Sequence, residues 1–333
     1  MSSDLFSSQT TKNLLDGKFI YFFGDSNIRA IYKDLLWLIE YGRLIPDDRL
    51  KKKNEESHAN DIRTSNGELH NGCDYDERRE YLENCIIKFQ FITRLYQQDF
   101  VDKIYNFSIN PDIIVINSCV WDLTRWGSTD SVEKFKTRIH ETFKLFRTVI
   151  PTTRIIWVAT LPPAFKSRGG FLTKDIEFMR NMLPWHIAYA NQYVANVARS
   201  YSIDYLDVHY YFQFLLNYHA PDGIHWDPKS VRYMTNFLLT HICLSWNETP
   251  PGIVALDSIF VSKSYFVTQK QEVNNNKKLD PAPFRNISNN RSKRNRKQRR
   301  NFKKMKQAVN VGNTSNSAPW NFLYENQTNF FRL

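Results

Sequence analysis

Short apolar runs alternate with amphipathic segments over the first 250 residues of the chain. Continuous apolar runs of this length are typical of parallel strands, which are covered on both faces. Amphipathic stretches with helical spacing follow most of the runs, and strands that alternate with helices predict a doubly wound α/β sheet. The five runs are residues 19–23, 86–92, 113–116, 155–160 and 205–208.

Three parts of the chain depart from this pattern. Residues 45–84 are polar and long, which favours an insertion or mobile loop between the first two strands. Residues 250–333 are polar and biased, so we expect a disordered tail with an aromatic cluster at 320–331 that could dock elsewhere. The predicted domains are an N-terminal extension at 1–17, an α/β domain at 18–249 and the tail at 250–333.

The net charge of +11 is unevenly distributed. Residues 263–333 carry 16 Lys or Arg and 3 Asp or Glu, a net charge of +13, whereas the other 262 residues carry 29 basic and 31 acidic side chains. The basicity therefore belongs to the tail. Residues 291–306 are dense enough in Lys and Arg to favour salt-sensitive contact with a polyanion or nucleic acid, the alternative being a solvated tail without a partner.

Cysteine usage and hydropathy indicate the cellular compartment in which the chain is expected. Cys73, Cys85, Cys119 and Cys243 are scattered without a CxxC pair, so free thiols in a reducing compartment are expected. No run approaches the roughly 20 apolar residues of a membrane span, and the N-terminus lacks the pattern of a secretory signal. We expect an intracellular, cytoplasmic monomer, with the basic tail allowing nuclear localisation.

Ser26 closes the tripeptide Gly24-Asp25-Ser26, between the first apolar run and the first amphipathic segment. Functional groups of open α/β sheets gather beyond the carboxyl ends of the strands. A helix that starts there offers free backbone N–H groups and a dipole that favours negative charge. Ser26 is therefore a candidate nucleophile, although a serine or aspartate here also suits a helix cap.

A serine nucleophile needs a base and a group that orients the base. Asp222 and His225 lie three positions apart in a stretch just before the last amphipathic segment. A turn there could set the carboxylate against one imidazole nitrogen and leave the other for Ser26. The fold would bring the ends of the first and last strands to one edge of the sheet.

Four other residues are alternatives or near neighbours of this site. His209 and His219 are competing bases, and Cys119 is an alternative nucleophile, for which a buried inert thiol is the competing interpretation. Asp207 follows the fifth run and is expected to be a structural cap.

Four stretches, FFGDSNIRAIYKDLL, NGCDYDERREY, DIIVINSCVWDLTRWG and DGIHWD, together resemble the PC-esterase domain proteins. These form a branch of the GDSL/SGNH hydrolase superfamily that is similar to polysaccharide O-acetyltransferases of plants and fungi. The resemblance covers residues 18–246. It implies a flavodoxin-like three-layer SGNH-hydrolase fold with a five-stranded parallel sheet. It also implies Ser26 as nucleophile, His225 as base and Asp222 as the carboxylate that orients it.

The chain departs from this superfamily at the oxyanion hole. SGNH hydrolases supply an asparagine from a Gly-x-Asn-Asp motif after the third strand, where this chain has Trp121. Asn117, at the end of the strand, is the candidate substitute, unless it only makes a turn. A glycine N–H is the other donor that the resemblance implies, with Gly72 the nearest match and Gly67 an alternative, beside the N–H of Ser26. One lost oxyanion donor costs about 10²–10³ in rate.

Two functions remain open from the sequence. The first is a serine ester hydrolase or O-acyltransferase that forms an acyl-enzyme on Ser26 and needs no metal or organic cofactor. The second is a binding module that keeps the fold without efficient turnover, which the altered third block favours. The acyl group and the alcohol are not specified by the sequence.

Overall fold

The computed structural model describes residues 5–53, 55–65, 75–126 and 130–251. The predictions for the tail beyond residue 251, for residues 291–306, and for Gly67, Gly72 and Cys73 lie outside the described residues. Seven strands form one sheet in the order β2-β3-β4-β1-β5-β6-β7. The strands are β1 Phe19–Gly24, β2 Ile62–Arg63, β3 Arg78–Leu82, β4 Ile86–Phe91, β5 Ile113–Ile116, β6 Arg154–Val158 and β7 Asp204–Leu206.

Five neighbouring strands of the sheet, β4-β1-β5-β6-β7, run parallel. They correspond to the five apolar runs of the sequence, and their order is that of flavodoxin-like folds. The doubly wound α/β fold class is therefore confirmed. The expected count of five strands is wrong for the sheet as a whole, because β2 and β3 add an antiparallel edge beyond β4.

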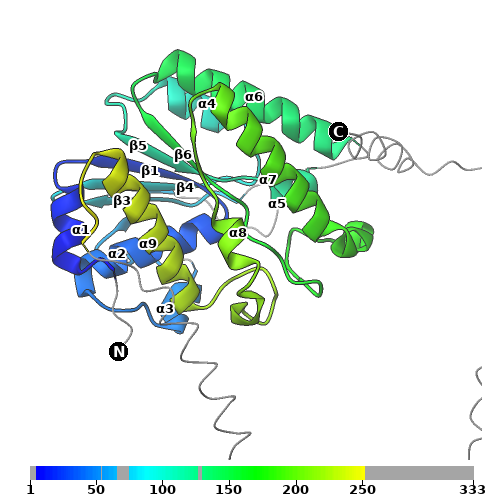
Figure 1. The fold of residues 1–333 in the computed structure, drawn as a ribbon, viewed down its shortest axis with the longest axis horizontal. Coiled ribbons are helices and arrows are strands. Elements are labelled where there is room, and N and C mark those ends of the chain that lie inside the picture. The colour runs from blue at the N-terminus through cyan, green and yellow to red at the C-terminus, as the bar shows by residue number, and fades with distance from the viewer. Residues whose placement is uncertain (1–4, 54, 66–74, 127–129, 252–333) are drawn as a thin grey trace, which may run out of the picture. The chain divides into compact units, whose positions relative to one another are not determined.

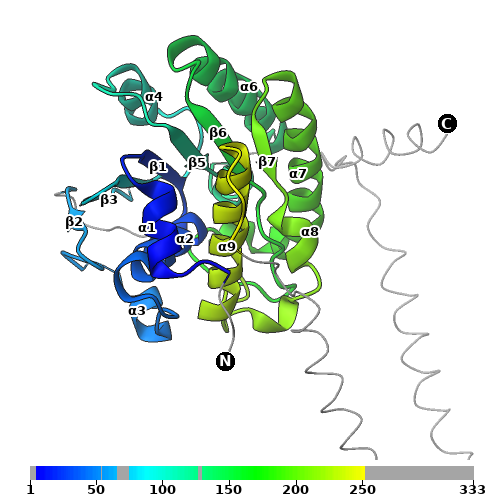
Figure 2. The same ribbon diagram turned by 60° about the vertical axis from the view of Figure 1, so that its left-hand side comes forward.

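The two extra strands come from the polar stretch that the sequence predicted to be an insertion or mobile loop. β3 pairs with β4 in antiparallel register, and β2 pairs with β3. The helix α3 (Asp47–Lys51) lies in the same stretch. Figure 2 shows β2 at one edge of the sheet and β7 with α7 towards the other. The stretch 45–84 therefore contributes to the fold wherever it is described.

Helices cover both faces of the sheet, because alternate residues of the buried strands point to opposite sides. Ile20 and Phe22 of β1 join a core with α1, α2 and α9, whereas Tyr21 and Phe23 join a core with α4, α6 and α7. Figure 1 shows these two helical layers on either side of the strands. The helices are α1 Ser8–Leu15, α2 Ser26–Tyr41, α4 Gln98–Tyr105, α5 Val120–Leu123, α6 Ser131–Val149, α7 Leu183–Ser200, α8 Val208–Phe212 and α9 Pro228–Ser245. Two 3₁₀ helices, η1 Lys174–Asn181 and η2 Leu216–Tyr218, complete the described elements.

The segment before β1 packs on the core. Phe6 and Leu15 are fully buried, and the Ser8 hydroxyl donates a 2.6 Å hydrogen bond to the Ile39 carbonyl in α2. α1 therefore supports the helix that carries Ser26. The domain boundaries at 17 and 249 remain predictions.

Candidate active site

Ser26 is the first residue of α2 and follows β1 directly. The carboxylate of Asp25, not Ser26, caps the helix, because its Oδ1 accepts a 2.8 Å hydrogen bond from the Asn27 N–H. β1 pairs with β4 on one side and β5 on the other, so the strand order reverses here. Crevices at such reversals are the usual ligand sites of open α/β sheets. The hydroxyl of Ser26 therefore lies at the point where the strand order reverses, and Asp25 caps the helix.

Ser26, His225 and Asp222 form a continuous chain of hydrogen bonds. The Nε2 of His225 lies 2.7 Å from the Oγ of Ser26, and its Nδ1 lies 2.6 Å from the Oδ2 of Asp222. The side chains of His225 and Asp222 are 38% and 37% exposed, so the chain of hydrogen bonds opens to solvent. If Asp222 accepts the Nδ1 proton, Nε2 is free to accept the proton of the serine hydroxyl.

A tight turn brings Asp222 and His225 together. Oδ1 of Asp222 accepts hydrogen bonds of 2.9 Å from the backbone N–H groups of Ile224 and His225, and Gly223 makes the turn at a φ of 70°. Burial alone would raise the pKa of Asp222, but hydrogen bonds from His225 and these backbone groups hold that pKa well below its usual value. Asp222 is therefore an ionised partner for the imidazole.

The competing residues are engaged elsewhere. His209 Nδ1 lies 2.7 Å from the Thr160 carbonyl, and both ring nitrogens of His219 lie within 2.9 Å of backbone carbonyls. Cys119 is 2% exposed, and burial raises the pKa of its thiol, so it is not a reactive thiolate. Asp207 caps α8 by accepting from the Tyr210 N–H, as its sequence position predicted.

Asn117 does not serve as the expected oxyanion donor in this structure. Its Nδ2 donates 2.7 Å to the Val158 carbonyl and 2.9 Å to the Thr160 hydroxyl. An amide nitrogen has two hydrogens, so none is left for an oxyanion. Because both partners lie at the end of β6, Asn117 ties β5 to its neighbour. The donors that remain for the proposed site are backbone N–H groups, of which Ser26 is described and Gly72 is not.

The block that replaces the Gly-x-Asn-Asp motif forms a buried polar cluster that sequence reasoning missed. The Asp122 carboxylate accepts a short hydrogen bond from the Ser118 hydroxyl and pairs with Arg138 of α6 at 2.8 Å. Burial raises the pKa of Asp122 from 3.8 to about 6, against the opposing effect of these hydrogen bonds. The four-residue spacing of Ser118 and Asp122 within NSCVWDL could have indicated that their side chains contact each other. The cluster fastens α5, beside the carboxyl end of β5, to α6.

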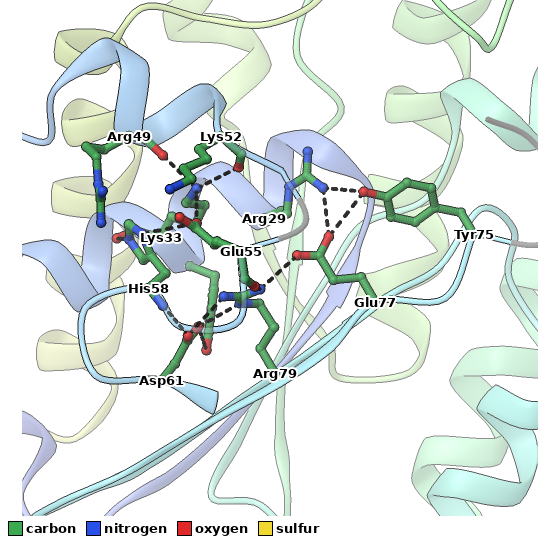
Figure 3. A network of polar contacts seen from close by, with 11 residues as sticks. Arg29, Lys33, Arg49, Lys52, Glu55, His58, Asp61, Tyr75, Glu77 and Arg79 are labelled. Carbon is green, nitrogen blue, oxygen red and sulfur yellow. Dashed lines mark hydrogen bonds and ion pairs between the residues drawn. The ribbon is translucent and has the colours of Figure 1, made fainter. Parts of the chain in front are cut away.

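A second buried polar network includes Arg29 and Lys33 of α2, the helix that begins with Ser26 (Figure 3). Arg29 donates 2.7 Å to Glu77 and 2.6 Å to the Tyr75 hydroxyl, with both charged side chains under 8% exposed. Deeper in the network, Lys33 pairs with Glu55 at 2.6 Å, and Arg79 pairs with Asp61 at 2.7 Å. The first two ion pairs join α2 to the residue that precedes β3 and to the segment before β2, and the third joins β3 to that same segment. Hydrophobic periodicity gives no signal for such inward-facing charges.

Within 5–53, 55–65, 75–126 and 130–251, no group of three His, Cys, Asp or Glu side chains is arranged to hold a metal ion. In the same part of the chain, no helix is both long and apolar enough to cross a membrane.

Comparisons with known proteins place the chain in a family. No protein-family model matches it. A GDSL-like lipase from Bacteroides thetaiotaomicron VPI-5482 covers 68% of this chain and 89% of its own, at 14% identity and a TM-score of 0.41, which is too remote to bear on activity. The PC-esterase domain-containing protein 1A of Homo sapiens is 32% identical over 255 residues, and protein 1B is 29% identical over 256. Each alignment covers 74% of this chain, but only 56% and 59% of the relatives, so the chain spans little more than half their length. The chain belongs to the family of PC-esterase domain-containing proteins.

Proposed function

We propose that the chain is a serine esterase or O-acyltransferase that forms an acyl-enzyme on Ser26. The observation that carries the proposal is the hydrogen-bond chain from Ser26 through His225 to Asp222, with distances of 2.7 and 2.6 Å. Its members come from the start of α2 and from the turn before α9, and its form is that of serine hydrolases. The names of the relatives, which call their domain a PC-esterase, agree with ester chemistry.

In the proposed reaction, Ser26 Oγ attacks the ester carbonyl carbon while His225 Nε2 takes the hydroxyl proton. The carbonyl electrons move to oxygen, which the Ser26 N–H at the start of α2 and the Gly72 N–H stabilise. The ester C–O bond then breaks, and the alcohol leaves with the proton from Nε2. Water, or a hydroxyl of a second substrate, then attacks the acyl carbon with His225 again as base. The bond between the acyl carbon and Ser26 Oγ breaks, and Oγ regains a proton from Nε2. Asp222 stays ionised and stabilises the imidazolium.

A binding module with little turnover is the second candidate, and the position of Asn117 favours it. An SGNH hydrolase without a side-chain oxyanion donor loses about 10²–10³ in rate. Both amide hydrogens of Asn117 are bonded to groups at the end of β6. On this proposal the chain would bind an acylated ligand beside Ser26 and release it unchanged.

The first proposal is tested by release of p-nitrophenol from p-nitrophenyl acetate. Wild type should turn over many times per active site, and Ser26→Ala should fall to the background rate of the ester in buffer. Ser8→Ala is the matched control, since it removes a hydroxyl from α1, outside the proposed site. Equal rates for wild type and Ser26→Ala would contradict the esterase and leave the binding module.

The basic tail is proposed to be separable from this chemistry. The charge of +13 on residues 263–333 supports contact with polyanions through residues 291–306, and with it a nuclear as well as a cytoplasmic location. Truncation after residue 262 should leave ester hydrolysis unchanged and abolish retention on heparin at low salt. Undiminished retention after truncation would contradict the proposal.

A further inference from the structure

Exposed aromatic residues gather on the segments that pack against the Asp222–His225 turn. We call the exposed side chains of Phe165, Phe178, Met182 and Trp185 the η1–α7 surface. Each is at least half exposed, with Trp185 at 68% and the two phenylalanines at 65%. Exposed apolar groups that gather in one place indicate an interaction site more strongly than single exposed residues do.

Three of these four side chains lie on adjoining turns of helical backbone. Phe178 belongs to η1, Met182 lies between η1 and α7, and Trp185 lies in the first turn of α7. Positions separated by three or four residues share a helical face. Phe165 belongs to a loop tied to η1, because the Nε of Arg180 donates 2.9 Å to the Ser167 carbonyl. The four side chains of the η1–α7 surface therefore come from two segments that this hydrogen bond joins.

The loop that carries Phe165 contacts the proposed catalytic turn through its backbone. The N–H of Ala164 donates 2.8 Å to the Gly223 carbonyl, and the N–H of Arg168 donates 2.8 Å to the Asp222 carbonyl. A Cβ placed on Gly223 would lie 2.8 Å from the Cβ of Ala164. The loop that carries Phe165 of the η1–α7 surface therefore borders the turn that holds His225, whose side chain is 38% exposed.

The charges of this segment identify the kind of surface it fits. Lys166, Arg168 and Lys174 are exposed among its aromatic residues. Glu177 is paired with Arg180 at 2.7 Å, and Asp175 is also exposed, so the segment keeps a net positive charge. Aromatic side chains mixed with Lys and Arg are the composition of elements that lie at the headgroup level of a bilayer. Anionic lipids attract such cations when they are close to the membrane surface.

A second group of exposed aromatic residues differs from the η1–α7 surface in its charge. Tyr210, Tyr211 and Phe214 of the α8 region are also exposed, at 56%, 47% and 66%. The chain from 205 to 227 contains three aspartates and no Lys or Arg. That region lacks the charge that an anionic surface requires, whereas the η1–α7 surface has it.

We propose that the η1–α7 surface binds an anionic lipid bilayer and places the opening beside His225 at the membrane surface. Phe178, Met182 and Trp185 insert at headgroup level, and Lys166, Arg168 and Lys174 contact lipid phosphates. The proposal goes beyond the esterase and does not depend on it, because a binding module with the same surface would associate with membranes equally.

The basic tail also attracts anionic lipid, so the test must locate the contact. Hydrogen–deuterium exchange is measured on the full chain, with and without vesicles of phosphatidylcholine containing phosphatidylserine. The expected result is slower exchange in residues 162–189 when vesicles are present. Slower exchange confined to the region beyond residue 251, or none anywhere, would overturn the proposal. If the surface binds a protein partner instead of a membrane, vesicles should not slow exchange in residues 162–189.

Charge substitutions provide the second measurement, by vesicle sedimentation in salt high enough to weaken the tail's attraction. Phe178→Glu with Trp185→Glu should lower the partition coefficient at least about a hundredfold, since each buried aromatic contributes about tenfold or more. Tyr105→Glu with Ile109→Glu is the matched control, at exposed positions near the amino end of β5. Equal loss in both double variants would overturn the proposal.

Fluorophosphonate labelling without vesicles should be unchanged in both double variants, which separates this test from that of the esterase.

Discussion

The Nε2 of His225 lies 2.7 Å from the Oγ of Ser26, although 199 positions separate the two residues along the chain. The contact joins the start of α2 to the turn before α9, two helices that pack in the same core. Because α2 begins where the strand order reverses, the hydroxyl lies at the usual ligand site of such a sheet. Ser26 does not cap its helix, so its side chain is available for this partner.

Asp222 and His225 are predicted to act as one unit with Ser26. His225→Ala and Asp222→Asn should each lower kcat for ester hydrolysis by about 10³–10⁴, and the double variant should be hardly worse than His225→Ala. Steady-state kinetics on the four proteins measures this. His209→Ala is the control and should keep kcat within about threefold, because His209 is bonded to the Thr160 carbonyl. If His209→Ala were as damaging with folding intact, the assigned base would be wrong.

Asn117 is predicted to act on stability and not on the transition state. Asn117→Ala leaves the Val158 carbonyl and the Thr160 hydroxyl without their donor, so unfolding free energy should fall by about 1–3 kcal/mol. The kcat of the folded variant should fall less than about tenfold, well short of the cost of a lost oxyanion donor. Urea denaturation and steady-state kinetics on one preparation separate the two effects. A drop in kcat of a hundredfold or more, with KM unchanged, would restore Asn117 to the oxyanion hole.

The buried pair of Arg29 and Glu77 is predicted to contribute strongly to stability. Arg29→Met removes the nearer of two cations at a carboxylate that is 4% exposed and leaves only Arg79, at 3.5 Å; breaking a buried ion pair costs about 3–5 kcal/mol. Lys51→Met is the matched control, because the pair of Lys51 and Asp47 is 50% and 52% exposed and should contribute less than about 1 kcal/mol. Urea unfolding curves give both values. Similar costs for the two variants would show that the network in Figure 3 contributes no more than a surface pair.

Asp122 is predicted to make stability depend on pH in a defined window. Its pKa rises from 3.8 to about 6 on burial, so between these values the folded state holds the proton more tightly than the unfolded state. Stability from this group is therefore highest below about pH 4, falls as the pH rises towards 6, and is constant above that. Two pKa units correspond to about 3 kcal/mol. The pKa of Asp222 is lowered, so its stabilisation is lost only below about pH 4 and leaves this window unaffected.

Asp122→Asn should flatten this part of the profile, because the amide does not titrate. Urea denaturation at a series of pH values from 4 to 7 measures the slope for wild type and variant. An unchanged slope in Asp122→Asn would assign the pH dependence to other groups.

The five parallel strands could be predicted because strands covered on both faces are apolar throughout. β3 could not, since Arg78–Leu82 begins with three charged residues in a row and the buried Arg79 points inwards to pair with Asp61. A charge that is buried because its partner comes from a distant segment gives no periodic signal. β2 has only two residues, too few for any pattern.

In the candidate site, too, the sequence could predict contacts between residues close along the chain but not those that depend on distant segments. Asp222 and His225 are close in sequence, so their spacing alone indicated a pair, and the order along the α/β fold indicated Ser26 as their partner. The hydrogen bonds of Asn117 could not be foreseen, because their acceptors are supplied by residues 158 and 160 of the neighbouring strand end. The role of Asp25 as the cap of α2 could not be separated from that of Ser26 in the tripeptide, since both residue types cap helices.

Covalent labelling by a fluorophosphonate tests most directly whether Ser26 is an activated nucleophile. The full chain is incubated with the probe, digested, and searched by mass spectrometry for the modified residue. The account predicts a single phosphonylated serine, Ser26, with labelling abolished in Ser26→Ala and slowed by about 10³ or more in His225→Ala. An unlabelled wild type, or equal labelling of wild type and Ser26→Ala, would contradict it.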